Sequence, residues 1–170
     1  MEGEYLNGKL KKGNGKEYFE NGNTLFEGQY LNELRNGFGK EYYENGKLLY
    51  EGKYLNGKRN GKGKEYFDNG ELIYEGEYKN GLREGYGKEY NEINEIEFEG
   101  KYLKGKRWIG EGIEYDSNGY MEFIGDYKNG QRWNGKIKEY DLDNGVITFE
   151  GLLIEGEKIE NEFWFIFILF

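Results

Sequence analysis

The stretch Tyr74-Glu75-Gly76-Glu77-Tyr78-Lys79-Asn80-Gly81-Leu82-Arg83-Glu84-Gly85-Tyr86-Gly87-Lys88-Glu89-Tyr90 decides the fold, because close copies precede and follow it. The glycine after its first aromatic-acidic pair recurs every 24 to 26 residues, at Gly3, Gly28, Gly52, Gly76, Gly100, Gly125 and Gly151. Such a period is typical of arrays whose units pack only against their neighbours. We therefore predict about six units and the start of a seventh over residues 1–151. A divergent segment over residues 152–170 is predicted to cap the array or to bind a partner.

Each unit contains the signals for two strands and two turns. In the third unit, Tyr50-Glu51-Gly52-Lys53-Tyr54 alternates rings with charges, which is the period-two pattern of a half-exposed strand. Asn56-Gly57 then supplies the positive φ angles of a tight hairpin turn, residues 61–67 form the return strand, and Asp68-Asn69-Gly70 turns again. The predicted fold is all-β: an elongated array of stacked antiparallel β-hairpins that form a single-layer twisted sheet.

The alternation also predicts what holds the sheet together. Tyr74, Gly76 and Tyr78 point to one face, and Gly61 and Gly63 of the preceding return strand share a face with each other. We expect the glycines to leave room for rings of neighbouring strands to lie flat over the backbone. The rings would then stack from unit to unit as cross-strand pairs.

Composition excludes several classes of protein. Of 170 residues, 29 are glycine and 18% are aromatic, while proline, histidine and cysteine are absent; this favours sheet over helix and rules out disulfides and thiolate metal sites. The net charge of -9 divides into +1 for residues 1–60 and -10 for residues 61–170. Nucleic-acid binding is therefore not expected, and simple electrostatic docking on anionic lipid is disfavoured. No secretory leader opens the chain, so we expect a cytoplasmic protein, with membrane or cytoskeletal association left open.

Motifs that suggest chemistry have simpler structural explanations. Gly61-Lys62-Gly63-Lys64 resembles a phosphate loop, but a strand follows it where such a loop needs a helix. Asp141-Leu142-Asp143-Asn144-Gly145 fits a lengthened turn better than a calcium loop. We expect two series of glutamates to lie on solvated strand faces among lysines: Glu17, Glu41, Glu65 and Glu89, and Glu27, Glu51, Glu75 and Glu99, with Lys16, Lys40, Lys64 and Lys88. Without histidine or cysteine, we predict a protein that is not an enzyme and needs no cofactor or metal.

Candidate binding residues come from the aromatic positions. The recurring tyrosines are expected to form the packing spine of the sheet, or to line a shallow groove for an extended peptide: Tyr30, Tyr54, Tyr78, Tyr102 and Tyr127. Trp108 and Trp133 occupy corresponding places in the fifth and sixth units and mark where the repeat diverges. They are therefore included among the predicted binding residues.

The apolar run Phe163–Phe170 is the least repeat-like feature. It is too short to span a bilayer as a helix, which needs about 20 residues. It could be a closing strand, a self-association surface, a membrane-interface anchor or the start of a longer segment. An uncovered apolar run favours aggregation, so we favour capping or oligomerisation through Phe163, Trp164, Phe165 and Phe167.

The repeat resembles the MORN family (membrane occupation and recognition nexus), whose pattern appears here as Tyr74-x-Gly76-x-Tyr78-x-x-Gly81-x-x-x-Gly85-x-Gly87. The resemblance implies an elongated, groove-bearing sheet that serves as a scaffold, dimerisation module or protein-binding surface. Some members associate with membranes or phospholipids, and some bacterial relatives are antitoxin-like. We therefore predict a non-enzymatic scaffold that binds a protein partner or itself through its aromatic groove and C-terminal end. A peripheral membrane module and an antitoxin-like protein that binds a toxin remain alternatives, and a carboxylate-based hydrolase is the least favoured.

Overall fold

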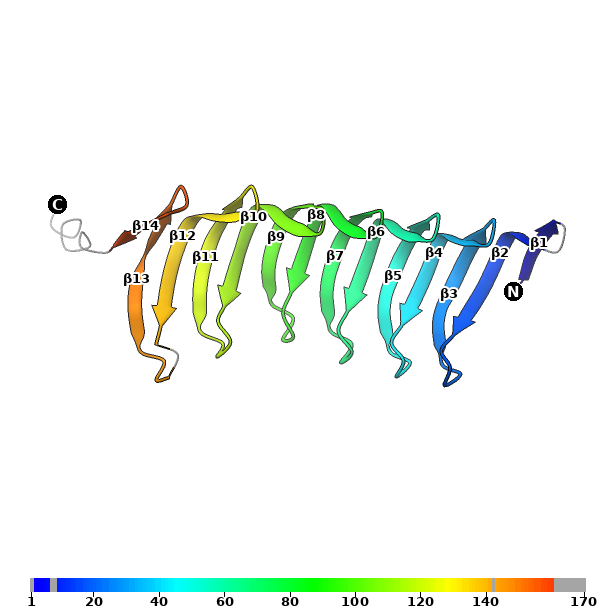
Figure 1. The fold of residues 1–170 in the computed structure, drawn as a ribbon, viewed down its shortest axis with the longest axis horizontal. Helices are drawn as coiled ribbons and strands as arrows, with labels where there is room; N and C mark the ends of the chain where they lie inside the picture. Colours follow the sequence, from blue (N-terminus) through cyan, green and yellow to red (C-terminus); the bar gives the residue numbers. More distant parts are fainter. Residues whose placement is uncertain (1, 7–8, 142, 161–170) are drawn as a thin grey trace.

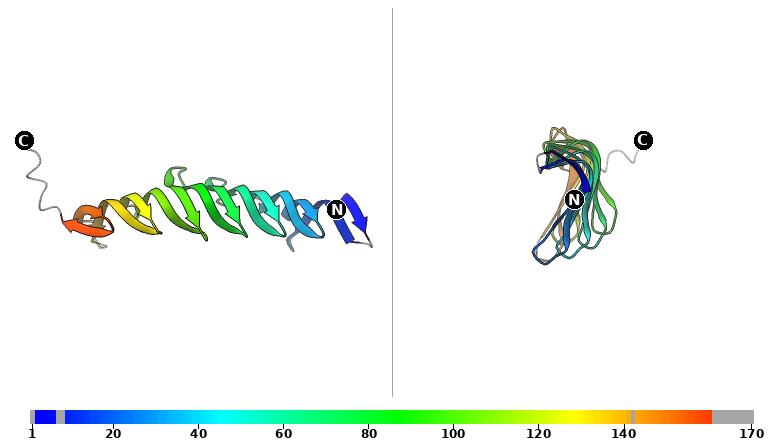
Figure 2. Two further views of the ribbon diagram at one scale, coloured as in Figure 1. Left: turned by 90° about the horizontal axis from the view of Figure 1, so that it is seen from above. Right: turned by 90° about the vertical axis from the view of Figure 1, so that its right-hand side faces the viewer.

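The computed structural model describes residues 2–6, 9–141 and 143–160, and these form one open antiparallel sheet of 14 strands that pair in chain order (Figure 1). The all-β hairpin array predicted from the sequence is confirmed. The sheet is elongated, with β1 and β14 at opposite ends, and it is curved when viewed along its long axis (Figure 2). The strands are β1 (Glu2–Leu6), β2 (Lys9–Tyr18), β3 (Thr24–Leu31), β4 (Leu34–Tyr42), β5 (Leu48–Leu55), β6 (Lys58–Tyr66), β7 (Leu72–Lys79), β8 (Leu82–Tyr90), β9 (Ile96–Leu103), β10 (Lys106–Tyr115), β11 (Met121–Lys128), β12 (Gln131–Tyr140), β13 (Ile147–Ile154) and β14 (Glu157–Glu160).

The hairpin turns have the backbone angles that their sequences predict. Asn56 and Gly57 have φ angles of 49° and 81°, as a two-residue turn with two positive φ angles requires. Asn32 and Glu33 adopt the same conformation without a glycine, at 51° and 65°. Each turn is also tied to the unit before it: the Gly57 N–H donates to the Arg35 carbonyl oxygen at 2.9 Å. The units therefore contact one another at the hairpin tips as well as along the strands.

One face of the sheet, the ring face, carries the core. It is the face to which Tyr74, Gly76 and Tyr78 point, and its most deeply buried side chains form a line along the array: Phe26, Tyr50, Tyr74, Phe98 and Phe123, each 0% exposed. A Cβ atom added to Gly52 or Gly63 would lie only 2.4 or 2.3 Å from the Tyr50 hydroxyl oxygen. The predicted role of the glycines, which leave room for rings over the backbone, is confirmed.

The rings meet edge to face, so the prediction of stacked rings is wrong in its geometry. The ring centroids of Tyr50 and Tyr78 are 5.2 Å apart with an interplanar angle of 85°, and those of Tyr74 and Tyr102 are 5.0 Å apart at 85°. The positive edge of one aromatic ring is attracted to the negative face of the next, which favours this arrangement over a face-to-face sandwich. The rings still join each unit to the following one, as expected.

The pairing of glycines across adjacent strands shows that the register of the strands shifts within β10. From β3 to β10 one row of glycines pairs across every strand: Gly28, Gly39, Gly52, Gly63, Gly76, Gly87, Gly100 and Gly110. In β10 the pairing then moves by two residues, because Gly112 and not Gly110 faces Gly125 of β11. The unit that contains this shift also contains Trp108 and spans 25 residues where the central units span 24. One extra residue thus changes the register.

The regular sheet continues through β13 and β14, which pair from Gly151↔Glu160 to Ile154↔Glu157. The proposed division into an array over residues 1–151 and a C-terminal segment over residues 152–170 therefore falls within a hairpin, and it stays a proposal. In the described part of the chain, no helix is long and apolar enough to cross a membrane.

Candidate functional site

A ladder of arginine and glutamate side chains covers the rings on the ring face. Arg59 donates to Glu65 in its own hairpin (Nη1–Oε1, 2.8 Å), and Arg83 of the next unit donates to the other oxygen of Glu65 (Nη2–Oε2, 2.8 Å). The Arg59 guanidinium carbon also lies 4.1 Å from the centroid of the Tyr50 ring. The same contacts continue without a break through Glu17, Arg35, Glu41, Arg59, Glu65, Arg83, Glu89 and Arg107.

This ladder corrects the prediction that all the recurring glutamates lie on solvated strand faces. The side chains of Glu41, Glu65 and Glu89 are only 16–20% exposed, and that of Glu17 is 34% exposed. Burial alone would raise the pKa of Glu65, but the hydrogen bonds and positive charges of Arg83 and Arg59 outweigh it and hold that pKa below its usual value. Each of these carboxylates is paired with one or two arginines, which gives it a place in the packing of the sheet.

The five predicted binding tyrosines lie together on the ring face and are buried there, with exposed fractions of 3–6% for Tyr30, Tyr54, Tyr78, Tyr102 and Tyr127. Their hydroxyls point toward the ladder: that of Tyr30 donates to Glu17 at 2.6 Å and that of Tyr102 to Glu89 at 3.0 Å. The buried Tyr54 hydroxyl has no hydrogen-bond partner among the described residues. This geometry supports the packing role. A role in binding an extended peptide stays a prediction.

The two predicted tryptophans lie close to the hairpin turns, near the start of β10 and β12, and away from the five recurring tyrosines. An added Cβ at Gly130 would lie 3.6 Å from the Trp108 ring, and one at Gly156 would lie 3.8 Å from the Trp133 ring, so each indole packs on the turn of the next hairpin. The Lys128 ammonium lies 4.0 Å from the centroid of the Trp133 ring. Binding through the tryptophans stays a prediction. Phe163, Trp164, Phe165 and Phe167 lie outside the described residues.

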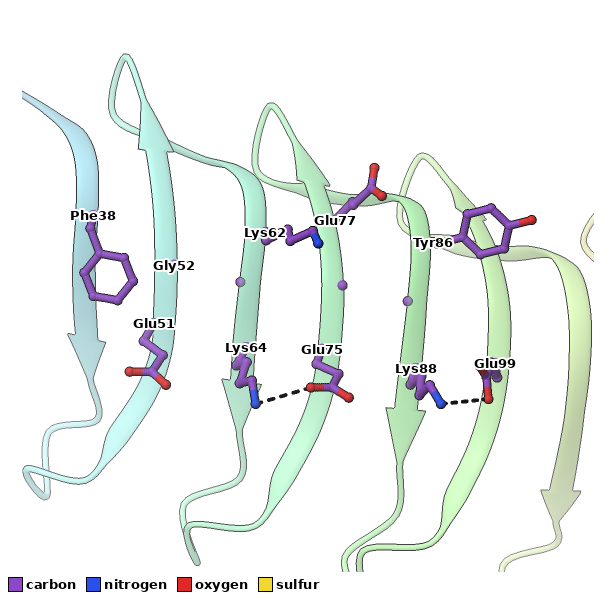
Figure 3. Close-up of a pocket in the computed structure, with 13 residues that line it drawn as sticks. Phe38, Glu51, Gly52, Lys62, Lys64, Glu75, Glu77, Tyr86, Lys88 and Glu99 are labelled. Atoms are coloured by element: carbon purple, nitrogen blue, oxygen red, sulfur yellow. Dashed lines mark ion pairs between the residues drawn. The ribbon is translucent and has the colours of Figure 1, made fainter.

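The opposite face, the groove face, is the one to which Glu75 and Glu77 point. Lysines and glutamates of adjacent strands form cross-strand ion pairs there: Lys16–Glu27 at 2.8 Å, Lys40–Glu51 at 3.4 Å, Lys64–Glu75 at 3.3 Å and Lys88–Glu99 at 3.0 Å (two of them drawn in Figure 3). This second series of glutamates is thus interleaved with lysines, as predicted. The row is electrically neutral over β2–β9.

Above this row runs a shallow groove of about 520 Å³ that crosses β4 to β9 (Figure 3). Phe38 and Tyr86 stand at its upper margin, 50% and 62% exposed, and the backbone of Gly63 and Gly76 forms part of its floor. The Lys101 ammonium lies 5.2 Å from the centroid of the Tyr86 ring. Sequence reasoning missed this site. Its signal was an aromatic residue at the middle position of Gly37-Phe38-Gly39 and Gly85-Tyr86-Gly87, where the third unit has Lys62.

Among the described residues, no group of three or more acidic side chains is arranged to hold a metal ion. The Asp141 carboxylate accepts hydrogen bonds from the N–H groups of Asp143 and Asn144 at 3.0 and 3.1 Å, which favours the turn interpretation of that segment. The groove face can therefore offer rings, aliphatic groups and charges to a ligand.

Comparison with known families gives two related matches. The MORN repeat matches residues 50–71 and 74–91, and a MORN repeat variant matches residues 11–32 and 35–56. No curated protein matches the chain. The matched residues span most of β2 to β8, the part of the sheet that contains most of the regular glycine row and most of the groove.

Proposed function

Because this chain is a MORN-repeat protein, and MORN repeats serve interactions with proteins or membranes, we propose that it is a non-enzymatic scaffold that binds a protein partner on its groove face. The observation that carries the proposal is the exposure of Phe38 and Tyr86 beside an open groove. Rings on the other face are buried under the arginine–glutamate ladder, whereas at least half of each of these two side chains is exposed. Exposed aromatic anchors of this kind dominate the binding energy of many protein interfaces.

The arrangement of the sheet supports a scaffold rather than a catalyst. Each strand pairs with its chain neighbours, and the groove is open along its length, so the same surface chemistry extends across many units. Acid–base catalysis by two carboxylates needs groups with different environments, and the recurring carboxylates have similar ones. A cytoplasmic location and self-association through the C-terminal end belong to the same proposal.

The proposal is tested by capture of partners on the immobilised full chain from a lysate of the source cells. The variant Phe38→Ser/Tyr86→Ser removes the two rings. The matched control is Ile93→Ser/Val146→Ser, which removes two apolar side chains that are 73% and 60% exposed in turns away from the groove. We expect a protein that is retained by the wild type and the control but about tenfold less by the groove variant. Equal retention by all three chains would contradict the proposal.

A further inference from the structure

The upper part of the groove face differs in charge from the rest of the molecule. Six exposed lysines gather there on β5 to β10 and form no ion pair with any described residue: Lys53, Lys58, Lys62, Lys79, Lys101 and Lys106. Two carboxylates lie close to them: Glu77, opposite Lys62, and Glu84, at the hairpin tips. The lysines of this region therefore outnumber the carboxylates close to them, although the whole chain has a charge of -9.

The same region is rich in exposed apolar side chains. Leu31, Leu34 and Phe38 on β3 and β4 precede the lysines, and Leu55, Leu82 and Tyr86 lie among them, with exposed fractions between 41% and 62% for the six residues. We call these six residues together with the six lysines the Leu–Lys strip. Strand alternation places its members on one face, since each follows or precedes a ring-face residue such as Tyr54 or Tyr78. The strip is therefore both basic and apolar.

Neighbouring features limit the strip on both sides. Below it, the Lys–Glu row is neutralised by its own ion pairs. Toward the C-terminal end, the register shift in β10 brings Glu111 opposite Asp126 of β11, so the basic character ends there. At the hairpin tips, the Glu84 carboxylate accepts the Lys104 backbone N–H at 2.8 Å. Carboxylates of the protein itself therefore offset only part of the positive charge of the strip.

We propose that the Leu–Lys strip binds an acidic peptide segment of the partner that also carries aromatic or aliphatic side chains. Lysines without an ion-pair partner attract carboxylates and fix their register. Burial of the exposed rings and leucines against the apolar side chains of the peptide makes the free energy of binding more favourable. The strip crosses seven strand spacings from β3 to β10, about 34 Å, which an extended segment of about ten residues covers. This inference rests on the proposed scaffold function and names the chemistry of its partner.

The test uses the full chain and a fluorescein-labelled peptide of ten residues in which glutamate alternates with phenylalanine or leucine. Fluorescence anisotropy measures its binding to the wild type, to Lys53→Glu/Lys101→Glu and to the control Lys47→Glu/Lys136→Glu. Both variants have the same net charge, and the control lysines are exposed but lie outside the strip. We expect binding about tenfold weaker in the strip variant, little change in the control, and a loss of affinity as salt rises. A peptide with glutamine in place of glutamate should bind weakly.

Three results would overturn the inference. One is no binding of the acidic peptide, and another is equal weakening in both variants, which would indicate nonspecific charge attraction. The third is binding to vesicles that contain phosphatidylserine, with the same dependence on the strip, while the peptide does not bind. If a captured partner needs Phe38 and Tyr86 but not Lys53 and Lys101, the scaffold function stands and the acidic class of partner is wrong.

Discussion

Arg83 of one repeat donates from Nη2 to Oε2 of Glu65 in the preceding repeat at 2.8 Å, so each unit supplies a charge that its neighbour needs. Glu65 also accepts a hydrogen bond from Arg59 of its own hairpin. The side chains of Glu65, Arg59 and Arg83 are each no more than 20% exposed. Loss of one arginine therefore affects two units at once. The ladder therefore links neighbouring units through ion pairs, in addition to the contacts between their rings.

Replacement of Arg59 by methionine should destabilise the chain, because it leaves the half-buried carboxylates of Glu41 and Glu65 without half of their donors. We expect a loss of about 1.5–3 kcal/mol in the free energy of unfolding, measured by urea denaturation. The control is Lys64→Met on the groove face, where the lysine side chain is 49% exposed; we expect about 0–1 kcal/mol there. Equal effects in the two variants would contradict a structural role for the ladder.

The stability of the chain should fall in acid. The arginines hold the pKa values of Glu65 and Glu89 below their usual value of 4.5 against the opposing effect of burial. A depressed pKa in the folded state stabilises the fold above the unfolded pKa, and this contribution disappears as the pH falls through the folded pKa. The urea concentration at the midpoint of unfolding should therefore stay constant near neutral pH and decrease below pH 4.5. The variant Arg83→Met should show a smaller decrease, and an identical decrease would exclude the arginines as its cause.

Gly63→Ala should force the Tyr50 ring out of its place, since the new Cβ would lie 2.3 Å from the hydroxyl oxygen and 2.6 Å from ring carbons. We expect a cost of about 1–3 kcal/mol. In a Tyr50→Leu background the same substitution should cost at least about 1 kcal/mol less, because the obstructing ring is absent. Gly119→Ala, at a turn glycine with nothing within 4 Å, should cost the same in both backgrounds. Additive costs for Gly63 and Tyr50 would show that the ring does not constrain that glycine.

Self-association through the C-terminal run can be measured by sedimentation velocity. The triple variant Phe163→Ser/Phe165→Ser/Phe167→Ser removes three large apolar side chains from the full chain and leaves the sequence of the described sheet unchanged. If the run associates, the wild type should sediment faster with rising concentration and the variant should not. Two chains that sediment alike as monomers would remove self-association from the proposed function.

Much of the fold follows from local rules. Asn56-Gly57 has the turn that its residue types require, and the alternation around Gly76 identifies the face that carries the rings. The ladder was harder to predict, because Arg59 and Glu41 are 18 residues apart and meet only through the pairing of three strands. Its signal was present in the sequence as Arg35, Arg59 and Arg83 at one place in successive units, each with a glutamate six residues later. The register change at Gly112 depends on one inserted residue, and period counting does not show where that residue is absorbed.

The Leu–Lys strip was hidden for a related reason. Net charge summed along the chain is negative, whereas the strip collects lysines that are separated in sequence and brought to one face by the hairpins. The ion-paired lysines of the row below, such as Lys64, cannot be told from the lysines of the strip by residue type or by their spacing along the strands. Only the cross-strand partners distinguish the free lysines from the paired ones, and those partners depend on register.

Methyl NMR of the full chain during titration with a captured partner tests the use of the groove face most directly. The methyl signals of Leu34, Leu55 and Leu82 report on the Leu–Lys strip, and those of Ile93 and Val146 report on exposed turns away from it. We predict that the three leucine signals shift with the partner concentration while the signals of Ile93 and Val146 stay in place. Shifts confined to the turn residues, or to residues of the ring face such as Leu49 and Ile73, would show that the partner binds elsewhere.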